Sequence, residues 1–442
     1  MKSVNQKPNT RRAGADVGSD TSFVSIGGAS PRQFGMCQPD LHQIRDWLVA
    51  EGVTSVAMEA TGVYWICLYD VLEAAGLEVL VVNGQHIKQV AGRKSDVSDA
   101  QWIAQLHSDG YLKGGFLPPD FCRELRDYLR HRETLVESAA QCVQRMQKSL
   151  ELLNLKIHRV INDLQGVSGM ALLRAIVAGE RDPTRLLALC DPQILRRKSQ
   201  RLQAALASNW QSQHLFTLAE HLAHYDFCQL QLSRVDTQIH RVLESVRSQR
   251  EKVHPWAGPV EPATKELRHN APDIPNLHEL TVRIFGGKDL SRLPGLNEYT
   301  ALRLMAELGV DVNKFPTPKH FVSYLGLSPA SAQSGQRRRK VRKHGARAGQ
   351  ILREAAQSMA RAKNSWLGSF YRRLSALRCP AIANKATARK LAEMIFNLLK
   401  RGHAYVEKGV ALYEARYLER QRQALQRQAQ KLGYTLSIPT PS

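Results

Sequence analysis

Four acidic residues near the start of the chain have the types and spacing of a metal-binding catalytic site. Asp16 lies in the first apolar run, Glu59 lies at the C-terminal end of the run TSVAMEA just before Ala60, and Asp96 and Asp99 lie three residues apart in GRKSDVSDAQW. If that last segment is helical, its two carboxylates share one face. Carboxylates that meet at one point repel each other unless cations neutralise them, and hard oxygen ligands select Mg²⁺ or Mn²⁺. Two such ions could flank a phosphate and stabilise both the attacking and the leaving oxygen.

Each of these residues also has an ordinary structural interpretation. Asp16 can be a turn residue after a strand, and Asp96 can be a helix N-cap. Glu59 is less easily explained in this way, because it interrupts an apolar strand where an unpaired buried carboxylate costs several kcal/mol. Arg93 and Lys94 either pair with the acids or hold a phosphate beside the metals, and the sequence leaves both roles open.

A second candidate site is a serine inside a dense basic run. Ser334 precedes Gly335, whose missing side chain allows close backbone approach, so the hydroxyl could attack a phosphodiester that nearby arginines orient and neutralise. Ser328 and Ser331 are rivals on chemistry alone. The basic run can instead be a solvated face or a localisation signal. Its cationic members are Arg337, Arg338, Arg339, Lys340, Arg342, Lys343 and Arg347.

The charge of the whole chain indicates a polyanionic partner. Its 442 residues include 62 lysines and arginines against 40 aspartates and glutamates, which gives a net charge of +22. Such a field favours nucleic acid, although solubility or attraction to a membrane surface would also explain it. The 7 cysteines are scattered without any C-x-x-C pair, which indicates neither a disulfide framework nor a structural zinc site. Because no signal sequence or membrane span is found, we expect a soluble, cytoplasmic protein.

The elements that must position the acids follow an α/β pattern over residues 11–115. Three short apolar runs separated by turn residues predict three strands, and they are followed by a helix, a strand, a helix, a strand and a helix. A strand meander that feeds such crossovers predicts a mixed sheet with helices on its faces. Asp16 and Glu59 then lie at the sheet edge where open α/β sheets bind their ligands.

Helical periodicity replaces this pattern from about residue 122. Two heptad-like seams predict an antiparallel coiled-coil arm roughly 50 Å long with a small helical cap at 161–210 between its halves, although a plain helical bundle is an equal alternative. The first seam contains Ala139, Val143, Met146, Leu150, Leu153 and Ile157, and the second contains Leu218, Leu222, Tyr225, Cys228, Leu232, Val235, Ile239, Val242 and Val246.

A proline-rich linker precedes a final helical domain. In that domain, LSRLPGLNEYTALRLMAELG predicts a Pro-Gly turn into an amphipathic helix, and two more helices and a Gln/Arg-rich tail helix follow the basic run. The predicted segments are an acidic metal-binding domain at 1–118, a helical coiled-coil region at 119–255, a linker at 256–282, a serine-bearing domain at 283–410 and a helical tail at 411–442.

These motifs resemble the DEDD-type transposases of bacterial insertion sequences, a family of bridge-RNA-guided recombinases. The likeness covers nearly the whole chain, and its most specific parts are VAMEATGVYW and GRKSDVSDAQW. It implies a RuvC-like, RNase H-type first domain whose four acidic positions match Asp16, Glu59, Asp96 and Asp99. It also implies a transposase domain whose serine precedes glycine, which selects Ser334. Where the family commonly has Ser-Gly-Gly-Lys, this chain has SGQRRRK, so no phosphate-binding lysine directly after the serine is assigned.

The resemblance further implies a mechanism and partners. Ser334 would attack a DNA phosphate and form a phosphoserine link, which strand exchange and religation would resolve. Family members act as oligomers, here a dimer or tetramer, and a structured guide RNA pairs with donor and target DNA. Two other functions remain open: a metal-dependent junction resolvase or nuclease that uses only the four acids, and a non-catalytic nucleic-acid-binding scaffold. Protein covalently attached to DNA would distinguish the serine mechanism from both.

Overall fold

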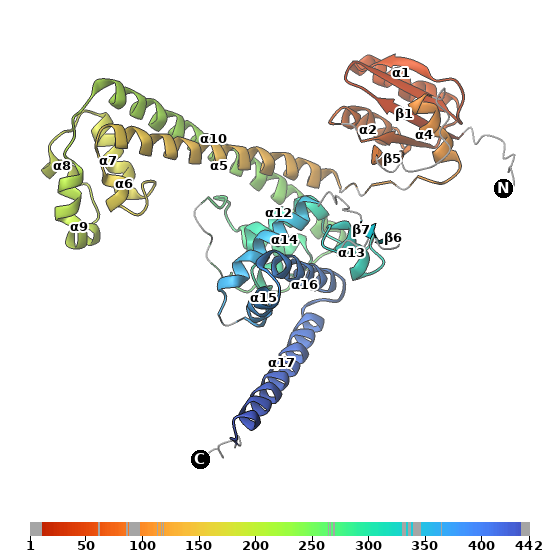
Figure 1. Ribbon diagram of the computed structural model, residues 1–442. Helices are drawn as coiled ribbons and strands as arrows, with labels where there is room; N and C mark the ends of the chain where they lie inside the picture. The colour runs from red at the N-terminus through yellow and green to blue at the C-terminus, as the bar shows by residue number, and fades with distance from the viewer. Residues whose placement is uncertain are drawn as a thin grey trace. The chain divides into compact units, whose positions relative to one another are not determined.

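The computed structural model describes residues 11–434 except 61, 85–86, 88–97, 113, 116, 118, 264, 266, 268–269, 329–332, 335–336, 339–345 and 364. The side chains of 333–334, 337–338, 409–414, 416–417 and 420 are also outside the description. The chain divides into two compact units, Met1–Leu117 and Pro118–Ser442 (Figure 1). Each unit has its own apolar core.

The first unit is built on a mixed sheet of five strands. The strands are β1 (Arg12–Val17), β2 (Thr21–Ile26), β3 (Arg32–Gly35), β4 (Ser55–Glu59) and β5 (Glu78–Val82). Their order across the sheet is β3-β2-β1-β4-β5, in which β1–β2 and β2–β3 are antiparallel and β1–β4 and β4–β5 are parallel. The predicted mixed sheet is therefore confirmed, and it is compatible with an RNase H-like fold.

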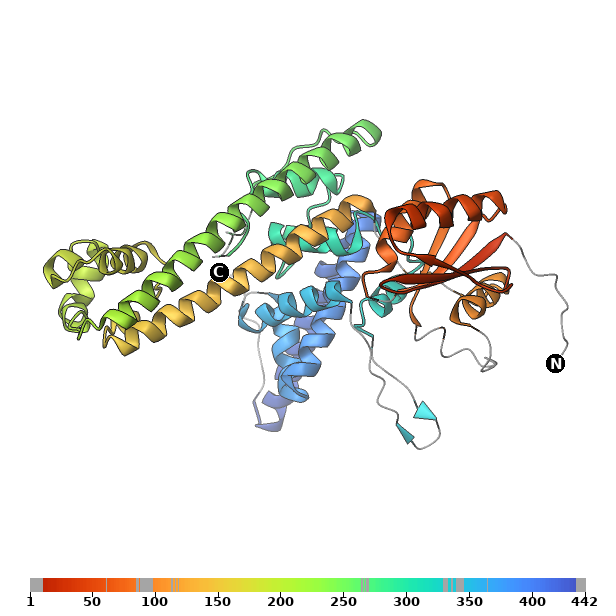
Figure 2. The ribbon, with the colours of Figure 1, turned by 90° about the horizontal axis from the view of Figure 1, so that it is seen from above.

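Helices cover both faces of this sheet because side chains alternate along each strand. On one face, alternate residues of β1 such as Ala13 and Ala15 pack in one core with residues of α1 (Gln38–Ala50) and α2 (Trp65–Ala74). On the other face lies α4 (Asp99–Ser108), and Figure 2 shows α1 and α4 on opposite sides of the sheet. This element order is the one that the sequence predicts.

The second unit contains two long helices, α5 (Asp120–Leu152) and α10 (Ser212–Val253), which pack along each other (Figure 1). They are antiparallel, since Arg132 contacts Asp236 near one end of the pair and Ser149 contacts Thr217 near the other. Between them the chain forms the predicted helical cap, which contains α6 (Ile157–Val160), α7 (Val167–Val177), α8 (Pro183–Leu187) and α9 (Pro192–Ala205).

The first of these long helices ends earlier than its seam predicts. Leu153 and Ile157 are buried as expected, but α5 ends at Leu152 and Asn154 adopts a left-handed φ of 56°. Asparagine tolerates this conformation better than other residues with a side chain, so it ends the helix and turns the chain into the cap. The apolar periodicity therefore continues past the helix end, because Ile157 belongs to the core of the cap.

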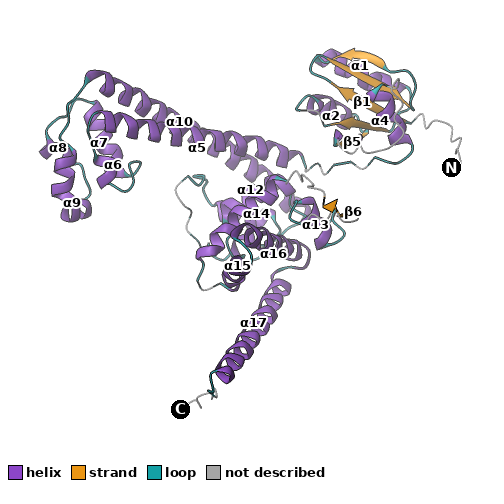
Figure 3. Cartoon of the chain, in the orientation of Figure 1, coloured by secondary structure: helices purple, strands orange, loops and turns teal. Residues whose placement is uncertain are grey.

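The rest of the second unit is mostly helical (Figure 3). The predicted helices after the Pro-Gly turn and after the basic run are present, but the sequence missed α11, α13 and α15. In α15 the interior Gly368 weakens the helical pattern, and a Cβ there would collide with the carbonyl oxygen of Ala362. The elements are α11 (Leu277–Ile284), η1 (Leu290–Arg292), α12 (Glu298–Leu308), α13 (Pro318–Tyr324), β6 (Gln333–Ser334), β7 (Arg337–Arg338), α14 (Arg347–Ser358), η2 (Met359–Arg361), α15 (Trp366–Leu377), α16 (Pro380–Arg401) and α17 (His403–Lys431).

Two elements cross predicted segment boundaries. Helix α11 begins at Leu277, inside the segment predicted as linker, and α17 begins at His403, before the predicted tail. Among the residues that the structure describes, no helix combines the length and the apolar character that crossing a membrane requires.

A buried ion pair ties the long helices to the segment that precedes α11. The Arg132 Nε donates a hydrogen bond to Asp236 Oδ1 at 2.6 Å, and the two side chains are 3% and 5% exposed. Arg132 also donates to the carbonyl oxygen of Asn270 at 2.8 Å, and the Asp273 backbone N–H donates to Asp236 Oδ2 at 3.0 Å. These additional hydrogen bonds satisfy both charged groups, which is the condition under which a buried ion pair is tolerated.

Candidate functional site

A glycine on β1 sets the position of Asp16 relative to Asp99. A Cβ atom at Gly14 would collide with the backbone nitrogen of Ala104 and the carbonyl oxygen of Ala100, so α4 lies directly against this strand. Residues two apart on a strand share a face, and Asp16 therefore faces the same side of the sheet as Gly14. Asp99 is the first residue of α4.

The strand register brings Glu59 beside Asp16. The parallel pairing of β1 and β4 sets Gly14 opposite Ala57. The last paired position is Ala15 opposite Met58, and Asp16 and Glu59, the last residue of β4, are the residues that directly follow it on the two strands. Ala57 packs in a core cluster with Ile103 of α4, so Glu59 lies on the sheet face that α4 covers. We call the group of Asp16, Glu59 and Asp99 the acidic edge.

The electrostatics of the acidic edge suit a bound cation. Burial, followed by the negative charge of Asp99, raises the pKa of Asp16. The fold therefore holds Asp99 close enough to Asp16 to oppose the ionisation of Asp16, which a divalent cation would relieve. A Cβ atom at Gly84 would collide with the Glu59 carboxylate, so the chain leaves room for that side chain only because residue 84 is glycine. A set of carboxylate oxygens fits a hard divalent ion.

Asp96, Arg93 and Lys94 lie outside the described residues, but the start of α4 bears on one expectation. The N-cap of this helix is Ser98, whose hydroxyl accepts the Gln101 backbone N–H at 3.3 Å, while Gln101 Oε1 accepts the Ser98 backbone N–H at the same distance. This capping box fixes Asp99 as the first helical residue. The N-cap of α4 is therefore Ser98 and not Asp96.

The basic run contains a short antiparallel strand pair. Ser334 in β6 is the backbone partner of Arg337 in β7, and Gln333 is the partner of Arg338. The rival Ser328 is described and lies before this pair. The other candidates, Ser331, Arg339, Lys340, Arg342 and Lys343, fall outside the described residues.

Arg347, the last cation of the run, begins α14 and forms an ion pair with Glu133 of α5. Glu133 also contacts Arg303 at 3.4 Å, and Arg303 contacts Glu354 at 3.0 Å. These four side chains line a polar cavity of about 520 Å³. The sequence did not indicate this network, because Glu133 and Arg347 are 214 residues apart. Arg347 is thus a member of the basic run that forms an ion pair within the protein.

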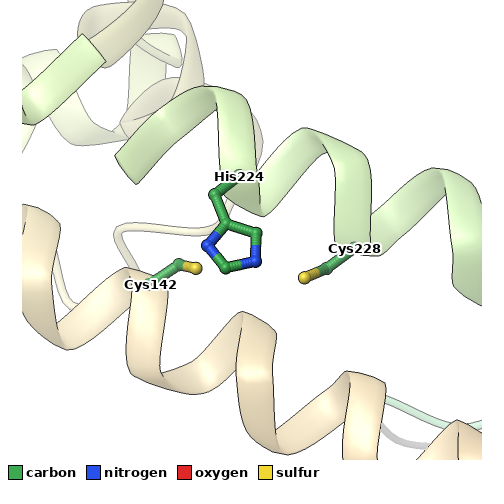
Figure 4. A group of neighbouring side chains, drawn as sticks. All are labelled: Cys142, His224 and Cys228. Atoms are coloured by element: carbon green, nitrogen blue, oxygen red, sulfur yellow. The ribbon is translucent and has the colours of Figure 1, made fainter. Parts of the chain in front are cut away.

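A further cluster that the sequence did not indicate lies between the two long helices. The ligand atoms of Cys142, His224 and Cys228 all lie within 4.8 Å of one another. Figure 4 shows the imidazole of His224 between the two sulfur atoms. Cysteine spacing missed it because one ligand comes from α5 and two come from α10.

Two family models match the chain. Residues 13–154 match a model described as a transposase of the DEDD type, and residues 287–372 match a model described as the transposase IS116/IS110/IS902 family. The first match contains the acidic edge, and the second contains the serine-bearing strand pair. No curated protein matches the chain.

Proposed function

Because the chain belongs to the IS110 family of insertion-sequence transposases, we propose that it cleaves and rejoins DNA with the acidic edge and a nucleophilic Ser334. Membership of this family implies that the enzyme cleaves and transfers DNA strands, and the DEDD domain implies that this activity depends on a divalent metal. The observation that supports the acidic edge most strongly is geometric: α4, which begins at Asp99, lies directly against Gly14, on the sheet face that Gly14 shares with Asp16.

In this proposal, Asp16, Glu59 and Asp99 hold Mg²⁺, or Mn²⁺ in its place, and Asp96 supplies a fourth carboxylate. When bound, the metal ions neutralise the DNA phosphate and stabilise the charge that develops on it. The carboxylates act as ligands, and Arg93 and Lys94 contact the phosphate beside them. Residues 1–118 form this metal-binding domain, and the close approach of Gly14 to α4 supports its geometry.

Ser334 is the proposed nucleophile of the serine-bearing domain, 283–410. Its hydroxyl oxygen forms a bond to the DNA phosphorus while the bond from phosphorus to the departing strand oxygen breaks, and the proton lost by the serine balances the one gained by that oxygen. In the phosphoserine link that results, the free hydroxyl of a second strand then attacks phosphorus, which restores a phosphodiester and releases the serine hydroxyl. The cations of the basic run, Arg337 to Lys343 with Arg347, neutralise the phosphate. The backbone pairing of Ser334 with Arg337 supports this arrangement, because it brings the serine next to a cationic residue.

The proposed partners are donor DNA, target DNA and a structured guide RNA. The net charge of +22 supports binding to several nucleic-acid strands at once. We also propose a homo-oligomer, dimer or tetramer, in which acidic edge and serine come from different subunits. The antiparallel pair α5–α10 would act as a coiled-coil arm in that assembly, and its length supports this role.

A denaturing gel tests the serine mechanism. The purified chain is incubated with guide RNA, Mg²⁺ and labelled DNA and then denatured, and protein covalently attached to DNA is expected. Ser334→Ala should form no adduct, whereas Ser328→Ala, a change six residues away in the same domain, should still form it. An adduct from Ser334→Ala would exclude this serine. Cleaved DNA without any adduct would favour a metal-dependent nuclease instead.

A further inference from the structure

The cluster between α5 and α10 brings together three side chains that can ligate a soft metal. Cys142 and Cys228 are 0% and 1% exposed, whereas His224 is exposed. His224 and Cys228 are four residues apart on α10, so they share one face of that helix and point towards α5 (Figure 4). The imidazole is directed at both sulfur atoms, an arrangement that apolar packing of two cysteines does not require.

We propose that Cys142, His224 and Cys228 bind a single Zn²⁺ ion. Zinc is held tetrahedrally by thiolates at about 2.3 Å and imidazoles at about 2.0–2.1 Å, so its ligand atoms lie roughly 3.5–3.8 Å from one another. Because the three ligand atoms already lie within 4.8 Å of one another, small side-chain rotations complete this geometry. Two thiolates balance the charge of the ion, so a neutral complex replaces two buried thiols.

The fourth coordination position belongs to water or to His221, which lies one turn before His224 on α10. Arg145 of α5 is the cation that faces His221 from the opposite helix. The sequence H-x-x-H-x-x-x-C thus presents three possible ligands on one face of α10.

The neighbours of the cluster indicate what the ion would stabilise. Arg174 of α7 pairs with Asp226 of α10 at 2.9 Å, and the Tyr225 hydroxyl donates to Gln165 Oε1 at 3.5 Å. The cluster therefore lies where α5, α10 and the helical cap meet in one core. A metal ion there would fix the register of α5 against α10 at the base of the cap. Its soft ligands separate it chemically from the acidic edge, whose oxygen ligands select hard ions.

Cobalt titration of the full chain under reducing conditions tests the site. Co²⁺ substitutes for Zn²⁺ and gives a thiolate-to-metal charge-transfer absorption that carboxylate ligands cannot produce. We expect about one such Co²⁺ per chain, displaced by Zn²⁺. Cys142→Ala and Cys228→Ala should abolish the absorption. Cys122→Ala removes another fully buried cysteine of α5 outside the cluster, and it should leave the absorption unchanged, as should Asp16→Asn.

His224→Ala keeps the proposal testable if the cysteine variants fail to fold, because His224 is exposed. This variant should weaken Co²⁺ binding more than tenfold while the circular dichroism stays unchanged. The proposal is overturned if the unmodified chain gives no charge-transfer absorption, or if His224→Ala binds Co²⁺ as tightly as the unmodified chain. A Cys142–Cys228 disulfide in protein isolated with its thiols blocked would also overturn it.

Discussion

The pKa values of carboxyl groups shift in opposite directions at the acidic edge of the first unit and in an ion-pair cluster of the second unit. Burial and the charge of Asp99 raise the pKa of Asp16, so the fold opposes its ionisation. In the second unit, hydrogen bonds from Lys156, His158 and Arg159 lower the pKa of Glu151 to about 2. The helical unit thus supplies its own cations, whereas the sheet gathers like charges that a cation from solution can neutralise.

The buried pair of Arg132 and Asp236 is a second case in which the protein itself supplies the cation that neutralises a carboxylate. Both charged groups are almost fully buried, and backbone groups of Asn270 and Asp273 complete their hydrogen bonds. Such a group of residues holds elements together without any external ligand. We infer that charge in the second unit is mainly structural at these positions, and that charge at the acidic edge serves a ligand.

The largest expected effect is the loss of strand cleavage when the acidic edge is neutralised. Asp16→Asn and Glu59→Gln each remove a metal ligand, so the cleavage rate should fall by at least roughly a hundredfold while the fold persists. A gel-based cleavage assay with guide RNA and Mg²⁺ measures this. Asp46→Asn, on an exposed residue of α1 paired with Arg45, should cleave at the unmodified rate. Wild-type activity in either acidic-edge variant would remove that residue from the site.

Breaking the buried ion pair should cost the second unit much of its stability. Asp236→Ala leaves Arg132 buried without its partner, so the free energy of unfolding should fall by about 3–5 kcal/mol. Asp226→Ala, on the same helix as Asp236, removes an exposed ion pair with Arg174 of α7. It should lower the free energy of unfolding by less than about 1 kcal/mol. Urea titrations of both variants measure the difference. Equal losses would contradict the distinction between buried and exposed charge in this unit.

A smaller effect is expected from the basic run. Replacing Arg337, Arg338 and Arg339 with alanine should weaken DNA binding and reduce its salt dependence by about 0.9 in log–log slope for each lost phosphate contact. Fluorescence anisotropy at several salt concentrations measures the slope. A control with the same change in net charge replaces the exposed arginines of α9, namely Arg196, Arg197 and Arg201. If both triple variants lose the same slope, the run is an ordinary solvated face.

The smallest effect concerns stability without metal. Because the fold raises the pKa of Asp16, the folded state favours the protonated form of this carboxyl over the charged form. The stabilisation that protonation gives is fully present below the ordinary aspartate pKa of 3.8, and it is lost as the pH rises through the raised pKa. Metal-free Asp16→Asn should therefore be slightly more stable than the unmodified chain at pH 7, by under about 1 kcal/mol. Thermal melts should show the difference disappearing below about pH 4. If Asp16→Asn were less stable than the unmodified chain at pH 7, burial and the charge of Asp99 would not destabilise the ionised Asp16.

The sequence predicted the sheet and its helices because local patterns determine them. Short apolar runs bounded by turn residues located each strand of the first unit, and the same patterns predicted that Asp16 and Glu59 would lie at strand positions. The start of α4 was less predictable, since both Asp96 and Ser98 are good N-cap residues and only the capping box with Gln101 decides between them.

Contacts between distant segments could not be predicted in this way. Cys142 lies more than 80 residues before His224 and Cys228, and Glu133 lies 214 residues before Arg347, so no spacing rule relates them. Only the antiparallel packing of α5 and α10 brings the first group together. The identity of Ser334 as nucleophile likewise came from resemblance, because chemistry alone did not separate it from Ser328 and Ser331.

Binding of Mn²⁺ to the metal-stripped, RNA-free chain, followed by electron paramagnetic resonance, tests most directly whether the acidic edge serves a cation. Mn²⁺ prefers oxygen ligands, so the thiols between the long helices should not compete for it. The unmodified chain should bind Mn²⁺, Glu59→Gln should bind it at least tenfold more weakly, and Glu151→Gln, which alters a carboxylate already paired with cations, should bind it as the unmodified chain does. Equal affinity in Glu59→Gln and the unmodified chain, or an equal loss in Glu151→Gln, would contradict the account.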